Sequence, residues 1–222
     1  TLLSLSAASA LAGQPLRLAR VVNVDDDAWR PFNMASFDQD KVRTSGDFQY
    51  TVYWDADKTL VVVRRDLRDH SVQTVSLPES TLTINPKDGH RNTVIGVSSE
   101  DGRLHLSWDH HCNPLRYGTS RPGFLTDPPD VLTAADFEPP RPLIANSKLE
   151  SAATYPRFLS NPPAPLHFIY RQGSSGNGDN YVQRYDAGTH TWSRFGKTGL
   201  FSRRGVYPLW KNSKSRCAYL ND

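Results

Sequence analysis

Four short polar segments hold the side chains best suited to proton transfer and to binding a carboxylate. They are 88–92 (DGHRN), 108–115 (WDHHCNPL), 154–158 (TYPRF) and 170–179 (YRQGSSGNGD). Histidine and tyrosine act as general acids and bases, and arginine binds a planar carboxylate through two parallel hydrogen bonds. Each segment stands at the start or the end of an apolar run, so we expect all four at strand ends.

These residue types suit β-elimination at a uronic acid. The reaction needs a cation or a strong donor that neutralises the carboxylate, because only then is the C5 proton acidic enough to remove. It also needs a base for that proton and an acid for the departing glycosidic oxygen. His90, His111, Tyr155 and Arg171 are our candidates. The sequence leaves open how base and acid divide between histidine and tyrosine.

The chain around these residues is rich in short strand patterns separated by turn residues. The expected strands are 48–54, 59–64, 71–77, 93–98, 104–108, 115–118, 155–159, 166–171, 181–185 and 191–195. β-Branched and aromatic residues favour these strands, and Asp-Gly or Asp-Ala-Gly turns separate several of them. No segment after the first residues has helical periodicity over three turns. The pattern predicts antiparallel meanders in an all-β protein.

Repeated meanders favour a β-propeller, although a β-sandwich also has short strands and turns. At about 40 to 50 residues per blade, the chain supplies about three to four blades, an incomplete arc over residues 25–222. The proline-rich segment 121–142 is expected to be irregular chain on the surface. His90 and Tyr155 open successive units, and His111 and Arg171 end strands. We therefore expect their side chains to meet within about 10 Å on one rim.

Taken together and in order, the motifs DGHRN, DHHCNPLRY, TYPRF and YRQGSSGNGD resemble the BNR-repeat family of propeller proteins, which includes ulvan lyases and related uronate lyases. The segment 26–33 (DDAWRPFN) resembles the N-terminal segment of that family. The resemblance implies a seven-bladed propeller and a polysaccharide lyase that cleaves an ulvan-like glycan. It also implies that His90 and His111 are the two family histidines, Tyr155 the catalytic tyrosine and Arg171 the carboxylate-neutralising arginine.

The same resemblance suggests residues that bind the substrate. His110 and Asn113 flank the second family histidine, and a small residue followed by Asn-Pro-Leu favours His111 over His110 for the catalytic position. Tyr219 resembles a later family tyrosine near the substrate. The chemistry requires no cofactor, and a structural metal ion is left open. His105 and the remaining histidines are expected to be strand residues without a chemical role.

Charge and composition narrow the possible partners. The net charge is +3, and the 26 lysines and arginines are scattered, so no basic stripe suits a nucleic acid. No later stretch approaches the roughly 20 apolar residues that span a bilayer. We expect an acidic polysaccharide as partner, no nucleic acid, no membrane and a monomer.

The first residues indicate the compartment. Residues 1–12 (TLLSLSAASALA) resemble the end of a signal peptide, which predicts a secreted, extracellular protein. Cys112 and Cys217 could form one disulfide there, and two unpaired buried thiols fit the sequence equally well. Two other functions stay open: a non-catalytic glycan-binding propeller and a sialidase-like hydrolase. The second needs an arginine triad and a tyrosine–glutamate pair, which we cannot assemble from this sequence.

Overall fold

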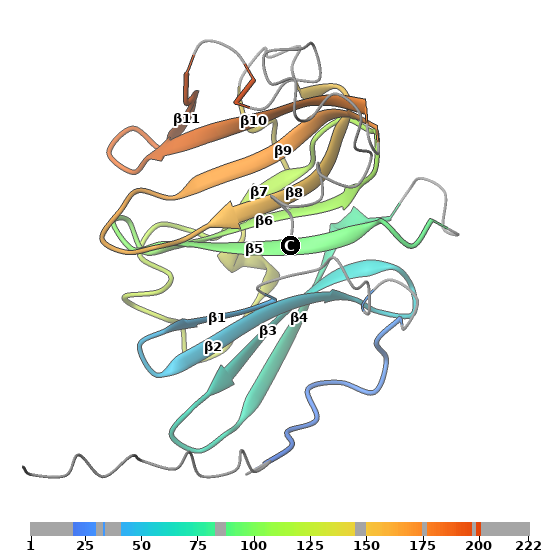
Figure 1. Ribbon diagram of the computed structural model, residues 1–222. Coiled ribbons are helices and arrows are strands. Elements are labelled where there is room, and N and C mark those ends of the chain that lie inside the picture. Colours follow the sequence, from blue (N-terminus) through green and yellow to red (C-terminus); the bar gives the residue numbers. More distant parts are fainter. Residues whose placement is uncertain are drawn as a thin grey trace, which may run out of the picture.

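The computed structural model shows an all-β chain, which confirms the expected fold class. It describes residues 20–29, 33, 41–82, 88–144, 150–174, 177–196 and 199–200. Within these residues, eleven strands form three antiparallel sheets (Figure 1). No helix in this described part is long and apolar enough to cross a bilayer.

The first sheet contains β1 (Val42–Ser45), β2 (Phe48–Trp54), β3 (Thr59–Asp66) and β4 (Val72–Thr81) in sequence order. β2 has the predicted bounds, because alternating aromatic and β-branched residues fit a strand with one buried face. β1 was not predicted. It is a four-residue polar segment (VRTS) at the edge of the sheet, and only its pairing with β2 makes it a strand.

The second sheet contains β5 (Asn92–Ser98), β6 (Arg103–His110) and β7 (Tyr117–Thr119). All eight residues of β6 are buried. The third sheet contains β8 (Ala153–Leu159), β9 (His167–Ser174), β10 (Asn177–Asp186) and β11 (Thr191–Arg194). In both sheets each strand pairs with the next one in sequence, as the meander pattern predicts.

The second sheet lies between the other two, and a hydrophobic core fills each interface. Figure 1 shows the green strands β5 to β7 between the blue and the orange sheets. One core joins the first two sheets, and the other joins the second and third sheets. β5 of the second sheet and β8 of the third sheet approach each other closely. A Cβ added at Gly96 of β5 would stand 2.6 Å from the Phe158 side chain of β8. Only glycine allows this approach.

The proline-rich segment is irregular, as expected, and contains one 3-10 turn, Ala134–Asp136. Most of it lies at the surface, as expected, but three of its apolar side chains are buried. Phe124, Leu125 and Leu132 belong to the core beneath the first two sheets, and the Phe124 ring lies 5.7 Å from that of Tyr50. The segment therefore replaces a missing fourth strand as cover for the core, and its apolar residues are the reason.

His105 is a strand residue, as expected, and it is also completely buried. It is 0% exposed in β6, its Nδ1 lies 2.7 Å from the Tyr117 hydroxyl, and its ring meets the Tyr185 ring edge-on at 4.5 Å. Burial holds the pKa of His105 well below its usual range. The residue is thus a neutral part of the second core.

Glu150 makes the stability of the fold depend on pH. Burial raises its pKa from 4.5 to about 7, although the Ile144 and Leu143 amides oppose the shift. The raised pKa favours folding below about pH 4.5, and that advantage is lost as pH rises towards 7. We expect Glu150→Gln to have nearly the wild-type free energy of unfolding at pH 4.5. At pH 8 its free energy of unfolding should be higher than that of the wild type, by at most about 3 kcal/mol.

Thermal unfolding of both proteins between pH 4.5 and 8 measures this difference. Glu79→Gln is the control, because Glu79 is exposed on β4 and its replacement should change stability equally at each pH. A Glu150→Gln difference that is constant with pH would contradict the assignment.

Candidate active site

The four candidate residues come from two neighbouring sheets. His90 lies in the turn just before β5, and His111 directly follows β6. Tyr155 lies in β8, and Arg171 lies in β9 of the third sheet. His90 and His111 lie at strand ends, as expected. Tyr155 is the third residue of β8 and Arg171 the fifth residue of β9, so these two lie inside their strands.

The structure brings these side chains together. The His90 and His111 rings are stacked with centroids 4.5 Å apart. The Tyr155 ring lies 6.1 Å from His90 and 6.0 Å from His111. The Arg171 guanidinium carbon lies 5.4 Å from the centre of the Tyr155 ring. Three possible proton carriers, the two imidazoles and the phenol, therefore lie next to a fixed positive charge.

A carboxylate that the sequence analysis did not select joins the two histidines. Asp88 Oδ1 lies 2.6 Å from His90 Nδ1, and Asp88 Oδ2 lies 2.7 Å from His111 Nδ1. The His90 backbone N–H also donates to Oδ1. Partial burial opposes ionisation of Asp88, but the hydrogen bonds from His90 and His111 outweigh it and lower the pKa to about 2. Asp88 is thus ionised at neutral pH.

An irregularity at the end of β6 decides which of two adjacent histidines faces the site. Asn92 pairs with His110, whereas Thr93 pairs with Trp108, so Asp109 is the extra residue of a β-bulge. Asp109 has a φ of +61°, in the left-handed region that few non-glycine residues adopt. Bulges commonly redirect side chains next to active sites.

His110 points inward as a result. It is 0% exposed, and the Arg116 backbone N–H donates to its Nε2 at 3.1 Å. Burial lowers the pKa of His110 to about 3, so its ring is neutral. His111 keeps 22% of its side chain exposed, and His90 keeps 44%. The structure thus places His110, which we had considered for substrate binding, inside the protein.

Asn113 has a similar supporting position. It is 4% exposed, its side-chain amide donates to the Asp109 carbonyl at 2.6 Å, and its Oδ1 accepts from the His111 N–H at 2.9 Å. These bonds fix the turn that carries His111. Asn113 also accepts from the Ala153 N–H at 2.8 Å through its backbone carbonyl.

This backbone bridge joins the turn after β6 to β8 of the third sheet. The Cys112 N–H donates to the Ala153 carbonyl at 3.0 Å and to the Thr154 hydroxyl at 2.9 Å. Tyr155 follows directly in the chain. The bridge therefore sets the distance between the second histidine and the tyrosine, although 44 residues (155 − 111) separate them in the sequence.

Tyr155 itself stands in a second bulge. Thr154 pairs with Arg171, and the next pair is Arg157 with Ile169, so Tyr155 and Pro156 are the irregular residues. The φ of Tyr155 is +52°, which is uncommon for a bulky side chain. Such strain persists only where the surrounding structure enforces it, and it is concentrated at functional sites.

Arg171 is buried below this ring. Its exposed fraction is 2%, and one guanidinium N–H donates to the Ser174 carbonyl at 3.4 Å. A charge in such surroundings is weakly screened by solvent, so it acts strongly on nearby negative charge.

A second buried cation supports Asp88 from below. Arg91 is 4% exposed, and its Nε lies 3.6 Å from Asp88 Oδ2. Arg91 also donates to Asn113 Oδ1 at 2.9 Å, and its guanidinium lies 3.5 Å from the buried Asp109 carboxylate. His90 and His111 are thus both held in place by one network of charged groups.

One group of atoms in the described chain could hold a metal ion. Asp88, His90 and His111 each offer an oxygen or a nitrogen, and these atoms lie within 4.8 Å of one another. Carboxylate and imidazole ligands suit Zn²⁺ and similar ions. A metal here would use the same three side chains that now form the two Asp88–histidine contacts.

Three predictions fall outside the described residues. They concern Tyr219, Cys217 and residues 1–12. The third substrate-binding residue, the disulfide and the leader therefore stay predictions. Cys112 is exposed, which differs from the alternative of a buried thiol.

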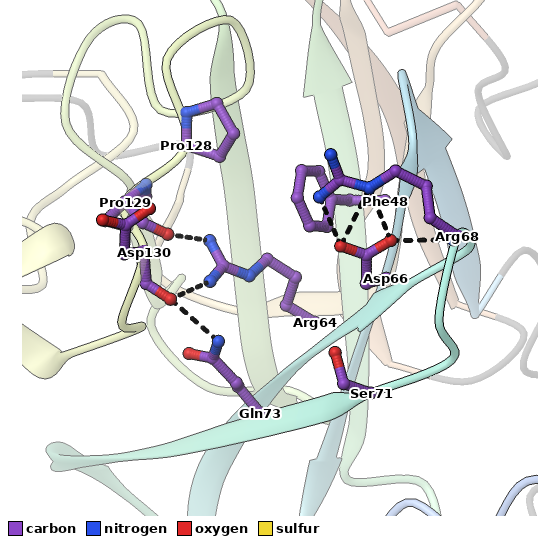
Figure 2. A pocket seen from close by; sticks show the side chains of 9 residues that line it. All are labelled: Phe48, Arg64, Asp66, Arg68, Ser71, Gln73, Pro128, Pro129 and Asp130. Carbon is purple, nitrogen blue, oxygen red and sulfur yellow. Dashed lines mark hydrogen bonds and ion pairs between the residues drawn. The ribbon is translucent and has the colours of Figure 1, made fainter.

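A separate pocket of about 290 Å³ lies on the first sheet, between β2 to β4 and the proline-rich segment (Figure 2). Its polar groups are largely used within the protein: Arg64 donates to the Pro129 and Asp130 carbonyls, and Arg68 pairs with Asp66. The pocket adjoins Phe48, the first residue of β2, whereas Trp54 at the other end of that strand donates to the Arg91 carbonyl. A seven-residue strand separates the two places by about 20 Å.

Comparisons with known proteins agree with the resemblance seen in the motifs. A family model described as "BNR repeat-containing family member" matches residues 48–222. The chain is 23% identical over 193 residues to the long isoform of ulvan lyase from Glaciecola sp. (strain KUL10), with 71% of this chain and 19% of the relative covered. It is 24% identical over 175 residues to the short isoform from Alteromonas sp. (strain LOR), with 63% and 33% covered.

Solved structures show the same fold. The polysaccharide lyase Uly1 superposes with a TM-score of 0.61 at 18% identity, over 85% of this chain and 45% of Uly1. An ulvan lyase of polysaccharide lyase family PL25, bound to -[GlcA(1-4)Rha3S]-, superposes with a TM-score of 0.58 at 11% identity, over 78% of this chain and 40% of the lyase. The chain spans less than half the length of each of these proteins.

Proposed function

Because the chain belongs to the BNR repeat-containing family, we propose that it is part of a secreted polysaccharide lyase that cleaves a uronic-acid-containing glycan by β-elimination. The observation that carries the proposal is the meeting of His90, His111, Tyr155 and Arg171, in which successive groups lie 4.5, 6.0 and 5.4 Å apart.

The residues divide the reaction as follows. Arg171 provides the positive charge that makes the uronate carboxylate less electron-rich, so the C5 proton becomes easier to remove. A histidine or Tyr155 takes that proton, the C4–O glycosidic bond breaks, and a C4–C5 double bond forms. A second group of this set gives a proton to the departing oxygen. His90 and His111 are partly exposed, so a sugar can reach them.

The three sheets are proposed to be consecutive blades of an incomplete β-propeller. Two observations support this arrangement. Each sheet is a meander, and β5 lies against both β1 and β8, the first strands of the neighbouring sheets. Among the described strands, no ladder joins the first sheet to the third sheet, as expected of an open arc. The relatives extend well beyond the length of this chain.

The substrate is proposed to be an acidic polysaccharide with alternating uronate units. One structural neighbour is bound to a glucuronate–rhamnose-3-sulfate chain, so ulvan is the first polymer to test. Incubation with ulvan and other uronate polymers should give absorbance from the new C4–C5 double bond. Binding of a glycan without any cleavage would instead favour a non-catalytic glycan-binding protein, and cleavage that leaves saturated non-reducing ends would favour a hydrolase.

A further inference from the structure

We propose that Asp88 is a positioning residue that fixes the ring tautomer of both histidines, so that each neutral ring carries its lone pair on Nε2. The role rests on the proposed lyase function, but the tautomer itself can be measured without any substrate. Nothing in the motif DGHRN alone indicates it, because His111 is 23 residues away from Asp88.

The argument starts with the chemistry of the carboxylate. An ionised carboxylate can only accept hydrogen bonds. Its two oxygens lie 2.6 Å from His90 Nδ1 and 2.7 Å from His111 Nδ1, so both nitrogens must carry the hydrogen. A neutral imidazole has one N–H and one lone pair. Whenever either ring is neutral, its lone pair is therefore on Nε2, the other ring nitrogen.

The surroundings keep Asp88 in this position. The His90 N–H donates to its Oδ1 at 3.1 Å, and the buried guanidinium of Arg91 lies 3.6 Å from its Oδ2. One carboxylate thus holds two stacked rings through the same ring atom, Nδ1. A carboxylate that holds a histidine in the correct tautomer is also the third member of serine-protease triads; here it would serve two histidines at once.

Replacement by asparagine tests this directly, because the amide is isosteric but has one acceptor and one donor. The NH₂ group must face one of the two Nδ1 atoms, and that ring must then move its hydrogen to Nε2. We expect Asp88→Asn to lower kcat by about tenfold with little change in KM. We also expect it to be no more active than Asp88→Ala, which forces neither tautomer. A merely structural Asp88 would give the opposite order, since asparagine preserves shape and packing.

Nitrogen NMR of histidine-labelled protein measures the tautomers themselves, with EDTA present and His90→Gln and His111→Gln for assignment. The wild type should show Nδ1–H on both rings, and Asp88→Asn should show Nε2–H on one of them. Asp101→Asn is the control: Asp101 faces His190 at 3.2 Å in another turn, so its loss should leave kcat and both site tautomers unchanged.

Two results would overturn the proposal. One is Nε2–H on either ring of the wild type. The other is stoichiometric binding of Zn²⁺ that shifts both Nδ1 resonances and is required for activity, because the same atoms would then hold a metal. If no glycan is cleaved but the tautomers behave as described, the proposed function fails and the role of Asp88 in ordering the rings stands.

Discussion

Replacing Tyr155 with phenylalanine should reduce kcat by about 100- to 10,000-fold, the usual contribution of a positioned acid or base. The change removes only the phenolic oxygen, and the ring keeps its place about 6 Å from both histidines and above the Arg171 guanidinium. KM should change little, because the lost interaction acts on the transferring proton. Initial rates of double-bond formation on ulvan measure the effect.

Tyr181→Phe is the matched control. Tyr181 is also a half-buried tyrosine of the third sheet, and its ring carries a guanidinium from Arg194 at 5.0 Å. It stacks on Tyr170 in place of a histidine, so it should keep full activity. Wild-type rates for Tyr155→Phe would remove the tyrosine from the reaction and leave the histidine pair as both acid and base.

Arg171→Lys should be the second most harmful change, with a loss of about 10- to 100-fold in kcat/KM, equal to one or two hydrogen bonds to a charged group. Lysine keeps the charge, but its ammonium cannot lie flat beneath the Tyr155 ring or bind a carboxylate through two parallel bonds. Its burial at a site that is 2% exposed is also less favourable, because an ammonium is strongly hydrated.

Arg194→Lys controls for the general cost of this exchange, since Arg194 makes the same contact with Tyr181. We expect it to keep its activity and to lose at most a little stability. Equal activity of both lysine variants would mean that Arg171 only anchors the chain next to Ser174, and that another cation neutralises the carboxylate.

The sequence predicted regular structure well and irregular structure poorly. β2 begins and ends where its aromatic and β-branched pattern indicates, because a buried strand depends on local residue types. The bulges at Asp109 and Tyr155 depend on tertiary contacts and have no local pattern. This explains why His110 was considered for substrate binding: nothing in two consecutive histidines shows which one points inward.

The convergence of the site was predictable only in part. Their placement in successive units indicated that His90, His111, Tyr155 and Arg171 would lie together, and their side chains do. Tyr155 and Arg171, however, lie inside their strands and not at the expected ends. Asp88 was missed although it stands two residues before His90. Aspartate before glycine is common in turns, so its type alone carries little information. A preference for a carboxylate near paired histidines would have identified it.

The backbone bridge between Asn113 and Ala153 limits how repeats of such a protein can be exchanged, in evolution or by design. Repeat proteins gain, lose and exchange whole repeats, and each repeat usually carries its own stability. Here one repeat carries both histidines and the next carries the tyrosine and the arginine. The smallest unit that could transfer the candidate site to another protein is therefore an adjacent pair of repeats with its junction intact. A chimaera that joins a foreign repeat at that junction would inherit half of the site, however well both parts fold.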